Sequence, residues 1–482
     1  MTTIAYLANQ FPSPVEPYVG AEIEELRRRG VRVIAGSVWK PDGRVRSNSA
    51  VVPDADFVVL QPFQITKLAR ALWLCVRRWR RIADLLQRVM LQGRENPVQR
   101  AKALLHTWLG ACYALRLEER EVEHIHVHHG YFGAWIGIVA ARLLNVGCSI
   151  TLHGSDLLTG TAYLDTKLES CQFCVTISEY NRRYILEHYP AIEPGNVMVA
   201  RLGVDVPEPA RFPAARVPGP MLPPSMLPAT TLGASRPRKP GDSRFHLLAV
   251  GRLHAVKDHA FLLRACAQLC ERGLDFQCEI AGEGPERRNL ELLIREDGLE
   301  GRVRLLGHVP HQQRDELYQR ADVCVLTSRS EGIPLVLMEA MARAKIVIAP
   351  AITGIPELVV AGLTGFLYQP GSVEDFAARI LLVHRLMTHR LMSHELMTYR
   401  ITPHGLTSTS FGSRPPGVPS AASQLDRVRN RAREQVRRHF NRQKNLEAFG
   451  DLFLRRVLER GPERTAGPDG HFLHEDSLLQ QI

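Results

Sequence analysis

The sequence predicts an α/β protein of two Rossmann-like domains, each built on a doubly wound parallel sheet, which face a central cleft. Three observations predict it. The 482-residue chain exceeds the length that one hydrophobic core usually supports. Short β-branched runs alternate with amphipathic helical segments, a pattern that requires a parallel sheet covered on both faces. A proline-rich stretch then divides this alternation into two separate series.

The first domain is predicted to span residues 1–205. An apolar run at residues 4–8 precedes an amphipathic segment at 19–29, which ends at Gly30 before the next β-branched run. Further strands are predicted at 124–128, 148–152 and 174–177. Residues 206–243 are crowded with proline, which sustains neither a helix nor a central strand, so they are interpreted as an interdomain linker.

The second domain is predicted at residues 244–440. Its strands are expected at 245–250, 277–281, 303–306, 323–326 and 346–349, with helices between them. A five-residue repeat and a Pro/Ser/Gly stretch at 384–423 indicate a low-complexity insertion; its histidines suggest a metal site as the alternative, but nothing shows them converging. A terminal helix at 441–460 is expected to return to the first domain, and a disordered tail at 461–482 follows.

Composition and charge limit the classes of partner. A formal charge of +11 favours an anionic partner. A nucleotide, a phospholipid surface and nucleic acid all qualify, but no RNA-binding or helix-turn-helix signature is present, so no nucleic acid is expected. The nine cysteines lie mostly in apolar runs and predict reduced, buried thiols in a cytosolic protein. Zinc or redox chemistry at Cys171 and Cys174 is the alternative. The apolar runs are too short for a signal peptide or a spanning helix.

Two glutamates follow a strand of the second domain. In SRSEGIPLVLMEAMARA (328–344), Glu331 lies in the loop after the strand and Glu339 in the helix that opens near Pro334. The free amides of a first helical turn form a site for an anion such as diphosphate. A capping Glu331 and a solvated Glu339 are the alternatives.

Two cations follow another strand of the same sheet. The loop GRLHAVKDH carries Arg252 and Lys257, whose charges can balance that of a departing diphosphate. Surface ion pairing is the alternative. Ligands of open α/β sheets bind beyond the carboxyl ends of the strands, so both loops are expected at one site.

Histidines mark two strand ends of the first domain. In TLHGSD, His153 occupies a polar loop where it can exchange hydrogen bonds with a substrate, and Asp156 is a second candidate. His128 is expected to support its strand end. Glu16, in the loop after the first strand, binds acceptor or donor, or instead holds the loop in place.

The segments VGRLHAVKDH, IAGEGPER, LLGHVP, SRSEGIPLVLMEAMA and GIPELVVAGLTGFLYQPGSVEDFA occur in this order and resemble glycosyltransferase family 4, the retaining group with the GT-B fold. The loop NQFPSPVEPYVGAEI is similar to that of colanic acid and other exopolysaccharide transferases. The resemblance implies roles for the donor-site residues: Arg252 and Lys257 on the pyrophosphate, Glu331 and His153 near the donor sugar, Gly332, Ile333, Pro334 and Leu335 around sugar and phosphate, and Glu339 on the ribose.

The resemblance therefore implies a retaining glycosyltransferase that moves a sugar from a nucleotide diphosphate sugar to a polysaccharide or lipid-linked acceptor. Catalysis is expected to rest on Glu331, His153, Arg252 and Lys257, with Glu16 and Asp156 near acceptor or sugar. No metal and no separate cofactor are expected. A nucleotide-sugar epimerase and a non-catalytic scaffold are the alternatives. The chain departs from the family at Ala344, expected to be a mild replacement for glycine, and at Lys345, which is expected to influence base or sugar choice. It also has Thr353 where the family usually has the first of two glycines.

Residues 67–102 are strongly basic, with ten basic and two acidic side chains. Apolar residues interleave with them at helical spacing, which predicts a helix on an anionic membrane or, alternatively, a basic helix packed on its own domain. The expected location is the cytoplasm, with a peripheral position at the inner face of the membrane left open.

Overall fold

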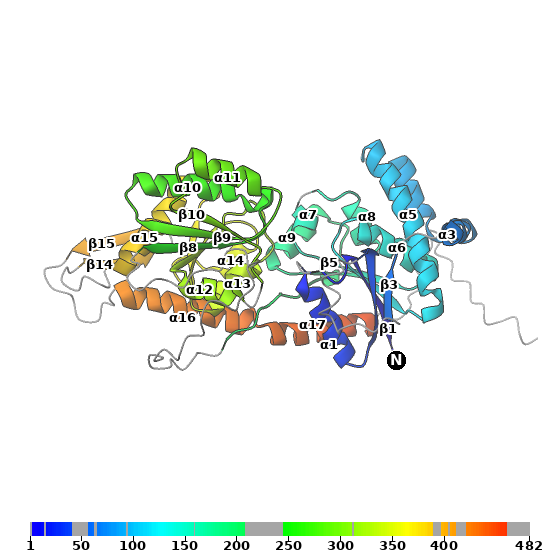
Figure 1. Ribbon diagram of the computed structural model, residues 1–482. Coiled ribbons are helices and arrows are strands. Elements are labelled where there is room, and N and C mark those ends of the chain that lie inside the picture. Colours follow the sequence, from blue (N-terminus) through cyan, green and yellow to red (C-terminus); the bar gives the residue numbers. More distant parts are fainter. Residues whose placement is uncertain are drawn as a thin grey trace, which may run out of the picture. The chain divides into compact units, whose positions relative to one another are not determined.

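The computed structural model describes residues 2–13, 16–40, 56–61, 65–92, 95–158, 160–207, 244–310, 313–388, 397–402, 405–410 and 421–459. Nearly all of the expected linker and the whole expected tail lie outside these ranges. The chain divides into two compact units (Figure 1). Unit 1 comprises Met1–Ile177, Arg182–Ala200 and Leu446–Ile482, and unit 2 comprises Ser178–Asn181 and Arg201–Asn445.

Unit 1 is built on a seven-stranded parallel sheet in the order β3-β2-β1-β4-β5-β6-β7. The strands are β1 (Thr3–Gln10), β2 (Arg32–Trp39), β3 (Phe57–Val59), β4 (His124–His128), β5 (Gly147–Leu152), β6 (Phe173–Thr176) and β7 (Val197–Val199). The strand order reverses between β1 and β4. The loops that follow these two strands therefore flank the point where open α/β sheets bind ligands.

Helices cover both faces of this sheet (Figure 1). They include α1 (Pro17–Arg28), α3 (Ile65–Arg77), α4 (Ala83–Gln87), α5 (Pro97–Leu117), α6 (Phe132–Leu144), α7 (Ser155–Leu158), α8 (Leu164–Glu169) and α9 (Glu179–His188). The C-terminal helix α17 (Arg442–Glu459) adds Phe449, Phe453 and Val457 to the core beneath β1. The prediction of a single basic helix at 67–102 is wrong, because short 3-10 and π turns interrupt the chain between α3 and α5.

Unit 2 is built on a six-stranded parallel sheet in the order β10-β9-β8-β11-β12-β13. The strands are β8 (Phe245–Val250), β9 (Phe276–Ala281), β10 (Val303–Gly307), β11 (Val323–Val325), β12 (Ile346–Pro350) and β13 (Phe366–Tyr368). Separate hydrophobic cores lie on its two faces. The order reverses between β8 and β11, the two strands that precede the predicted cations and Glu331. The predicted fold class, two Rossmann-like doubly wound sheets, is confirmed.

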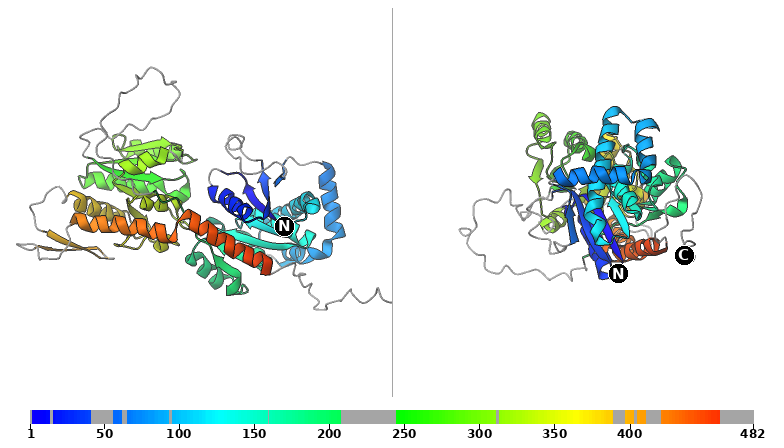
Figure 2. Two further views of the ribbon diagram at one scale, coloured as in Figure 1. Left: turned by 90° about the horizontal axis from the view of Figure 1, so that it is seen from below. Right: turned by 90° about the vertical axis from the view of Figure 1, so that its right-hand side faces the viewer.

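The helices of unit 2 include α10 (His259–Glu271), α11 (Arg287–Glu296), α12 (Arg314–Arg320), α13 (Leu335–Ala342), α14 (Ile355–Leu358), α15 (Val373–Thr388) and α16 (Ala421–His439). Part of the expected insertion at 384–423 is regular structure. Helix α15 extends into it, and β14 (Met397–Thr402) pairs antiparallel with β15 (Gly405–Ser410) (Figure 2).

Among the described residues, no helix is both long enough and apolar enough to cross a bilayer.

Candidate active site

The strand-end loops of unit 2 are drawn together by glycines. Gly251 N–H donates to the carbonyl of Ala281 at 3.0 Å. A Cβ on Gly282 would lie 1.8 Å from the Gly251 carbonyl oxygen, so only glycine fits there. A Cβ on Gly354 would lie 2.5 Å from the Gly332 carbonyl oxygen. The loops after β8, β9, β11 and β12 thus meet at one edge of the sheet.

Lys257 and Glu331 meet at the point where the strand order reverses. Lys257 Nζ lies 2.5 Å from Glu331 Oε1, and the exposed fractions of the two side chains are only 19% and 11%. Ser328 Oγ donates to the same carboxylate oxygen at 2.6 Å. Thr327 Oγ1 donates to the Lys257 carbonyl at 3.0 Å, which ties the two loops together. The alternative in which Glu331 caps the following helix is wrong, because no side chain caps α13.

Arg252 occupies the same loop as Lys257 and is exposed. Its guanidinium takes part in no ion pair within the described part of the chain, in contrast to the lysine. The loop therefore presents one paired ammonium and one guanidinium that is open to solvent. Such a guanidinium can bind two phosphate oxygens in parallel.

Glu339 lies in a different set of contacts from Glu331. Its side chain is buried within α13, where Tyr318 OH donates to Oε2 at 2.7 Å and Arg314 lies 3.6 Å from Oε1. The alternative of a solvated Glu339 is therefore wrong. Pro334 is the residue that precedes the first turn of α13, Ile333 is buried, and Leu335 begins the helix. The N–H groups of Gly332, Ile333 and Leu335 thus lie at the helix N-terminus, whereas Pro334 has no N–H to donate.

Two departures from the family pattern are backbone positions with positive φ. Ala344 has φ +55° and Thr353 has φ +44°, both in the left-handed region that glycine tolerates best. The replacement at Ala344 therefore carries a backbone strain that the residue types alone do not show. Thr353 is β-branched, which makes this conformation still less favourable. Its hydroxyl donates to the Glu331 carbonyl oxygen at 2.5 Å and so holds the loop that carries Glu331.

Lys345 lies away from this site. Its ammonium donates to the carbonyl oxygens of Gln319 and Ala321, at 2.8 and 3.1 Å, where α12 ends. Lys345 directly precedes β12, so it lies at the amino edge of the sheet, opposite the loops that carry Lys257 and Glu331. The prediction that Lys345 influences base or sugar choice is wrong for this reason.

The candidate residues of unit 1 form a buried chain of hydrogen bonds. His153 Nε2 lies 3.1 Å from His128 Nδ1, and His128 Nε2 lies 2.9 Å from Glu22 Oε2. Tyr6 OH also donates to Glu22. Burial, together with the charges of neighbouring histidines, holds the pKa of His153 well below its usual range. His153 is therefore a neutral hydrogen-bonding group at neutral pH.

A charged histidine lies beside this chain. His129 has φ +70°; its Nε2 lies 3.0 Å from Glu16 Oε1 and its Nδ1 lies 3.4 Å from Asp156 Oδ2. Burial opposes the charge, but the two carboxylates raise the pKa of His129 to about 10. Glu16 thus holds its loop to the strand end after β4. Sequence reasoning missed His129, as well as Glu22 and Tyr6.

Asp156 is the central acceptor of this cluster. Its carboxylate accepts hydrogen bonds from the amides of His153, Gly154 and Gly130, at 3.0, 2.9 and 2.9 Å. Burial disfavours its charged form, but the hydrogen bond and charge of His129 hold the pKa of Asp156 well below its usual range. An ionised Asp156 therefore fixes the loop that carries His153.

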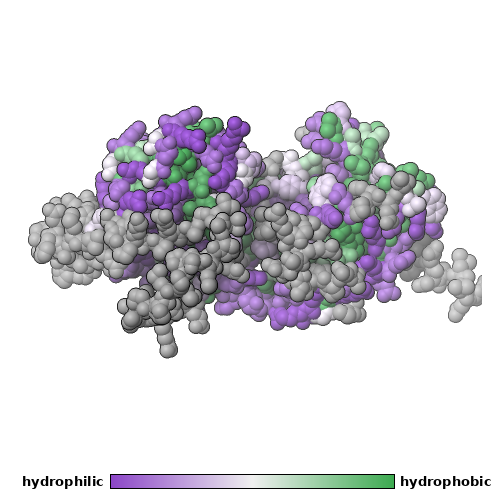
Figure 3. All heavy atoms as spheres, viewed as in Figure 1, coloured by the Kyte–Doolittle hydropathy of each residue, from purple (hydrophilic) through white to green (hydrophobic). Residues whose placement is uncertain are grey.

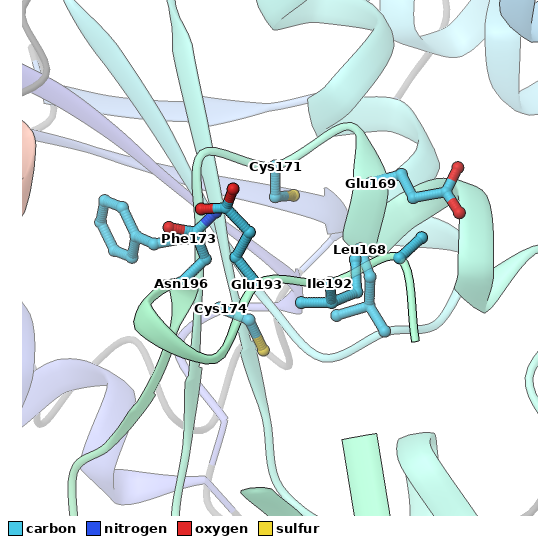
Figure 4. Close-up of a pocket in the computed structure, with 9 residues that line it drawn as sticks. Leu168, Glu169, Cys171, Phe173, Cys174, Ile192, Glu193 and Asn196 are labelled. Carbon is cyan, nitrogen blue, oxygen red and sulfur yellow. The ribbon is translucent and has the colours of Figure 1, made fainter. Parts of the chain in front are cut away.

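A cavity of about 320 Å³ lies at the opposite, amino edge of this sheet and carries Cys171 and Cys174 on its wall (Figure 4). All nine cysteines are free thiols. A hydrogen bond with Cys148, followed by burial, raises the pKa of Cys171, and burial raises that of Cys174. These thiols are protonated at neutral pH and are poor nucleophiles and metal ligands. No group of three or more suitable side chains in the described ranges is placed to hold a metal ion.

Two doubly wound sheets, each with polar side chains at its reversal point, are the architecture of the GT-B fold. Residues 15–208 match the family described as Glycosyltransferase Family 4, and residues 235–391 match Glycosyl transferases group 1. The chain belongs to glycosyltransferase family 4, as its motifs predicted.

Individual relatives agree with this assignment. The chain is 34% identical over 142 residues to the alpha-D-kanosaminyltransferase of Streptomyces kanamyceticus. The aligned segment covers 30% of this chain and 37% of that protein. It is 35% identical over 157 residues to the putative colanic acid biosynthesis glycosyltransferase WcaL of Escherichia coli, 31% of this chain and 39% of that protein. The aligned segments thus span less than two fifths of either relative.

The fold is also that of a solved structure, Anabaena HepE in complex with UDP. It has a TM-score of 0.60 and 15% identity, and the comparison covers 94% of this chain and 100% of that chain.

Proposed function

We propose that this chain is a retaining glycosyltransferase that moves a sugar from a nucleotide diphosphate sugar to a polysaccharide or lipid-linked saccharide acceptor, in exopolysaccharide or cell-surface glycan biosynthesis. The observation that carries the proposal is the Lys257–Glu331 pair at the reversal point of unit 2, with Arg252 on the same loop. The names of colanic acid relatives support the biosynthetic setting. HepE, which shares the fold, was solved with UDP.

In this proposal, Arg252, Lys257 and the amides at the start of α13 bind the donor diphosphate. The two cations and the helix N-terminus stabilise the negative charge that develops on the leaving group. This positive charge is the reason that we propose transfer without a metal ion. Glu331 orients the transferred sugar, and Glu339 binds the ribose hydroxyls. His153 belongs to the catalytic set as a neutral hydrogen-bonding group.

The acceptor hydroxyl attacks the anomeric carbon as its bond to the diphosphate oxygen breaks. Attack on the face that the diphosphate leaves retains the anomeric configuration. A phosphate oxygen of the leaving group takes the proton of the acceptor hydroxyl, so the step needs no separate base. Asp156 and Glu16 keep the strand-end loops of unit 1 in place for this chemistry.

Calorimetric titration of the full chain with UDP, GDP and ADP tests the donor site. At least one nucleotide is expected to bind the wild type and to lose affinity in Lys257→Ala. Lys345→Ala is the control, because the ammonium of this lysine also has protein oxygen partners, the carbonyls of Gln319 and Ala321, but lies at the opposite edge of the sheet. Binding of no nucleotide favours a scaffold, and isomerisation of a donor sugar without acceptor favours an epimerase; either result contradicts the proposal.

We also propose that unit 1 lies at the inner face of a membrane. One face of α3 packs on the unit through the buried Ala71 and Leu74, whereas Trp73 is 61% exposed. Trp79, in the next turn, is 55% exposed. Figure 3 shows hydrophobic residues gathered over the part of unit 1 that carries α5. Aromatic side chains among basic residues suit the headgroup region of an anionic bilayer.

A further inference from the structure

Four side chains of unit 1, Glu22, Tyr6, His128 and His153, form a hydrogen-bond network that we call the His153 network. Glu22 lies on α1, Tyr6 on β1 and His128 at the end of β4, and His153 follows β5. Their exposed fractions are 5%, 1%, 0% and 8%, so the network is shielded from bulk water. Both ring nitrogens of His128 take part, Nε2 toward Glu22 and Nδ1 toward His153. The position of the hydrogen on one histidine therefore determines its position on the other.

Glu22 determines which nitrogen of His128 carries a hydrogen. Tyr6 OH donates to Glu22 Oε2. Burial and the neighbouring charge of Glu22 raise the pKa of Tyr6 well above its usual range, so the phenol keeps this hydrogen. His128 Nε2 lies 2.9 Å from Glu22 Oε2 and 2.9 Å from the Tyr6 oxygen. Both oxygens act as acceptors toward His128, because the phenol hydrogen is directed to Glu22. His128 Nε2 is therefore the donor.

The same reasoning extends from His128 to His153. A neutral imidazole has one N–H and one lone pair, so a hydrogen on Nε2 leaves the lone pair of His128 on Nδ1. His153 Nε2 lies 3.1 Å from this lone pair and donates to it. The charged His129, with ring centroids 6.3 Å from His128 and 4.6 Å from His153, disfavours a further cation in the cluster. The lone pair of a neutral His153 then lies on its Nδ1.

The ring of His153 is held in place from several sides. The ring centroids of Tyr18 and His129 each lie 4.6 Å from that of His153. Asp156 accepts a hydrogen bond from the His153 amide at 3.0 Å and so fixes the backbone beneath the ring. These contacts oppose the half-turn of the ring that would exchange its two nitrogens. The hydrogen bonds of the network therefore decide which nitrogen is an acceptor.

We propose that Glu22, acting through His128, is a positioning residue that holds His153 as the tautomer with an N–H at Nε2 and a lone pair at Nδ1. His153 then accepts a hydrogen bond from a sugar hydroxyl of the nucleotide sugar and does not donate one. The contact with the sugar rests on the proposed function, whereas the tautomer is a property of unit 1 alone.

Nitrogen NMR of the full chain with isotope-labelled histidine reads the tautomer directly. An imidazole nitrogen with a lone pair resonates well downfield of one with a hydrogen, and couplings to the ring carbon protons distinguish Nδ1 from Nε2. The His153 signals are identified by their loss in His153→Gln. The wild type is expected to show the lone pair at Nδ1 of His153.

Two variants of Glu22 test its control of the tautomer. Glu22→Met has a similar length but removes the carboxylate, so the Tyr6 hydroxyl turns to donate to His128 Nε2. The hydrogen bonds of the network then reverse, and His153 is expected to change to the tautomer with a hydrogen at Nδ1. Glu22→Gln keeps an acceptor oxygen in the same shape and is the matched control, expected to retain the wild-type tautomer. Persistence of the doubly protonated His129 signals shows that the cluster is folded in each variant.

The outcomes separate the tautomer from the proposed function. A hydrogen at Nδ1 of His153 in the wild type, or an unchanged tautomer in folded Glu22→Met, overturns the role of Glu22. UDP-glucose and GDP-glucose are the probes for the sugar contact, and the one that binds is expected to move the Nδ1 signal upfield. A bound probe that leaves this signal unmoved overturns the contact. The expected tautomers in a chain that binds neither probe nor any free nucleotide support the role of Glu22 and contradict the proposed function.

Discussion

Ala344 stands where the family usually has glycine, and its stability effect measures the backbone strain of that replacement. Its φ of +55° lies in the left-handed region, directly after α13, where its amide donates to the Met341 carbonyl at 2.9 Å. A residue with a Cβ is about 1–2 kcal/mol less stable than glycine in this conformation. Glycine also makes the unfolded chain more flexible. This lowers the stability gained by replacing alanine with glycine by about 0.4–1 kcal/mol.

Ala344→Gly is therefore expected to stabilise unit 2 by about 0.8 kcal/mol, the difference between the midpoints of these two ranges. For a unit of this size, the gain corresponds to a rise of about 1–4 °C in its midpoint of thermal unfolding. Turnover is expected to stay unchanged, because Ala344 follows the C-terminal end of α13 whereas the candidate phosphate site lies at its N-terminus.

Differential scanning calorimetry of the full chain measures this shift. Ala340→Gly is the matched control, because Ala340 lies inside α13 and is buried. Glycine in a helix interior costs about 1 kcal/mol, so this control is expected to lower the transition of unit 2 and thereby identify it. A lower or unchanged transition in Ala344→Gly, alongside a lowered one in Ala340→Gly, would refute the reasoning.

Three further predictions concern the cations of unit 2, the charge of His129 in unit 1, and the exposed aromatic surface of unit 1. Lys257→Ala and Arg252→Ala are each expected to cut turnover by roughly 100- to 1000-fold, measured as nucleotide release from the donor; wild-type rates in both would contradict their assignment. The raised pKa of His129 stabilises the fold fully below about pH 6.5, and this contribution is lost as the pH rises through about 10. In His129→Gln, the free energy of unfolding in urea should therefore depend less on pH over that range. A pH profile parallel to that of the wild type would contradict the buried contacts of His129 with Glu16 and Asp156. Trp73→Ser with Trp79→Ser is expected to weaken binding to phosphatidylglycerol vesicles roughly tenfold, with unchanged weak binding to phosphatidylcholine; co-sedimentation measures both, and full retention would contradict membrane contact.

Much of the fold follows from periodicity. The apolar β-branched runs predicted as strands at 245–250 and 346–349 coincide with β8 and β12 to within one residue. Such runs are clear because parallel strands are buried on both faces. The breaks between α3 and α5 escaped prediction, because apolar spacing continues through the short turns at Trp79–Arg81 and Arg88–Gln92.

Much less of the candidate site follows from sequence. Lys257 and Glu331 were predictable, because each follows a strand beside the reversal point and the motifs around them are specific. The contacts of His129 were not, since Glu16, His129 and Asp156 come from two loops and the short helix α7, which lie more than 20 residues apart along the chain. The positive φ of Ala344 and Thr353 was also hidden, because side-chain identity alone does not reveal a backbone conformation that alanine and threonine rarely adopt.

The two reversal points share a principle that bears on binding. In unit 2, Lys257 is paired with Glu331; in unit 1, the charged His129 lies between Glu16 and Asp156. A poorly exposed charge without a partner is costly, so each cation is stabilised before any ligand arrives. In the complex proposed above, the donor diphosphate would replace Glu331 as the anionic partner of Lys257, so the ammonium would stay compensated. Glu331 then loses its cation, keeps the Ser328 hydroxyl at 2.6 Å, and is able to accept a hydrogen bond from a sugar hydroxyl. The pairing therefore links donor binding to the release of the carboxylate that is proposed to orient the sugar.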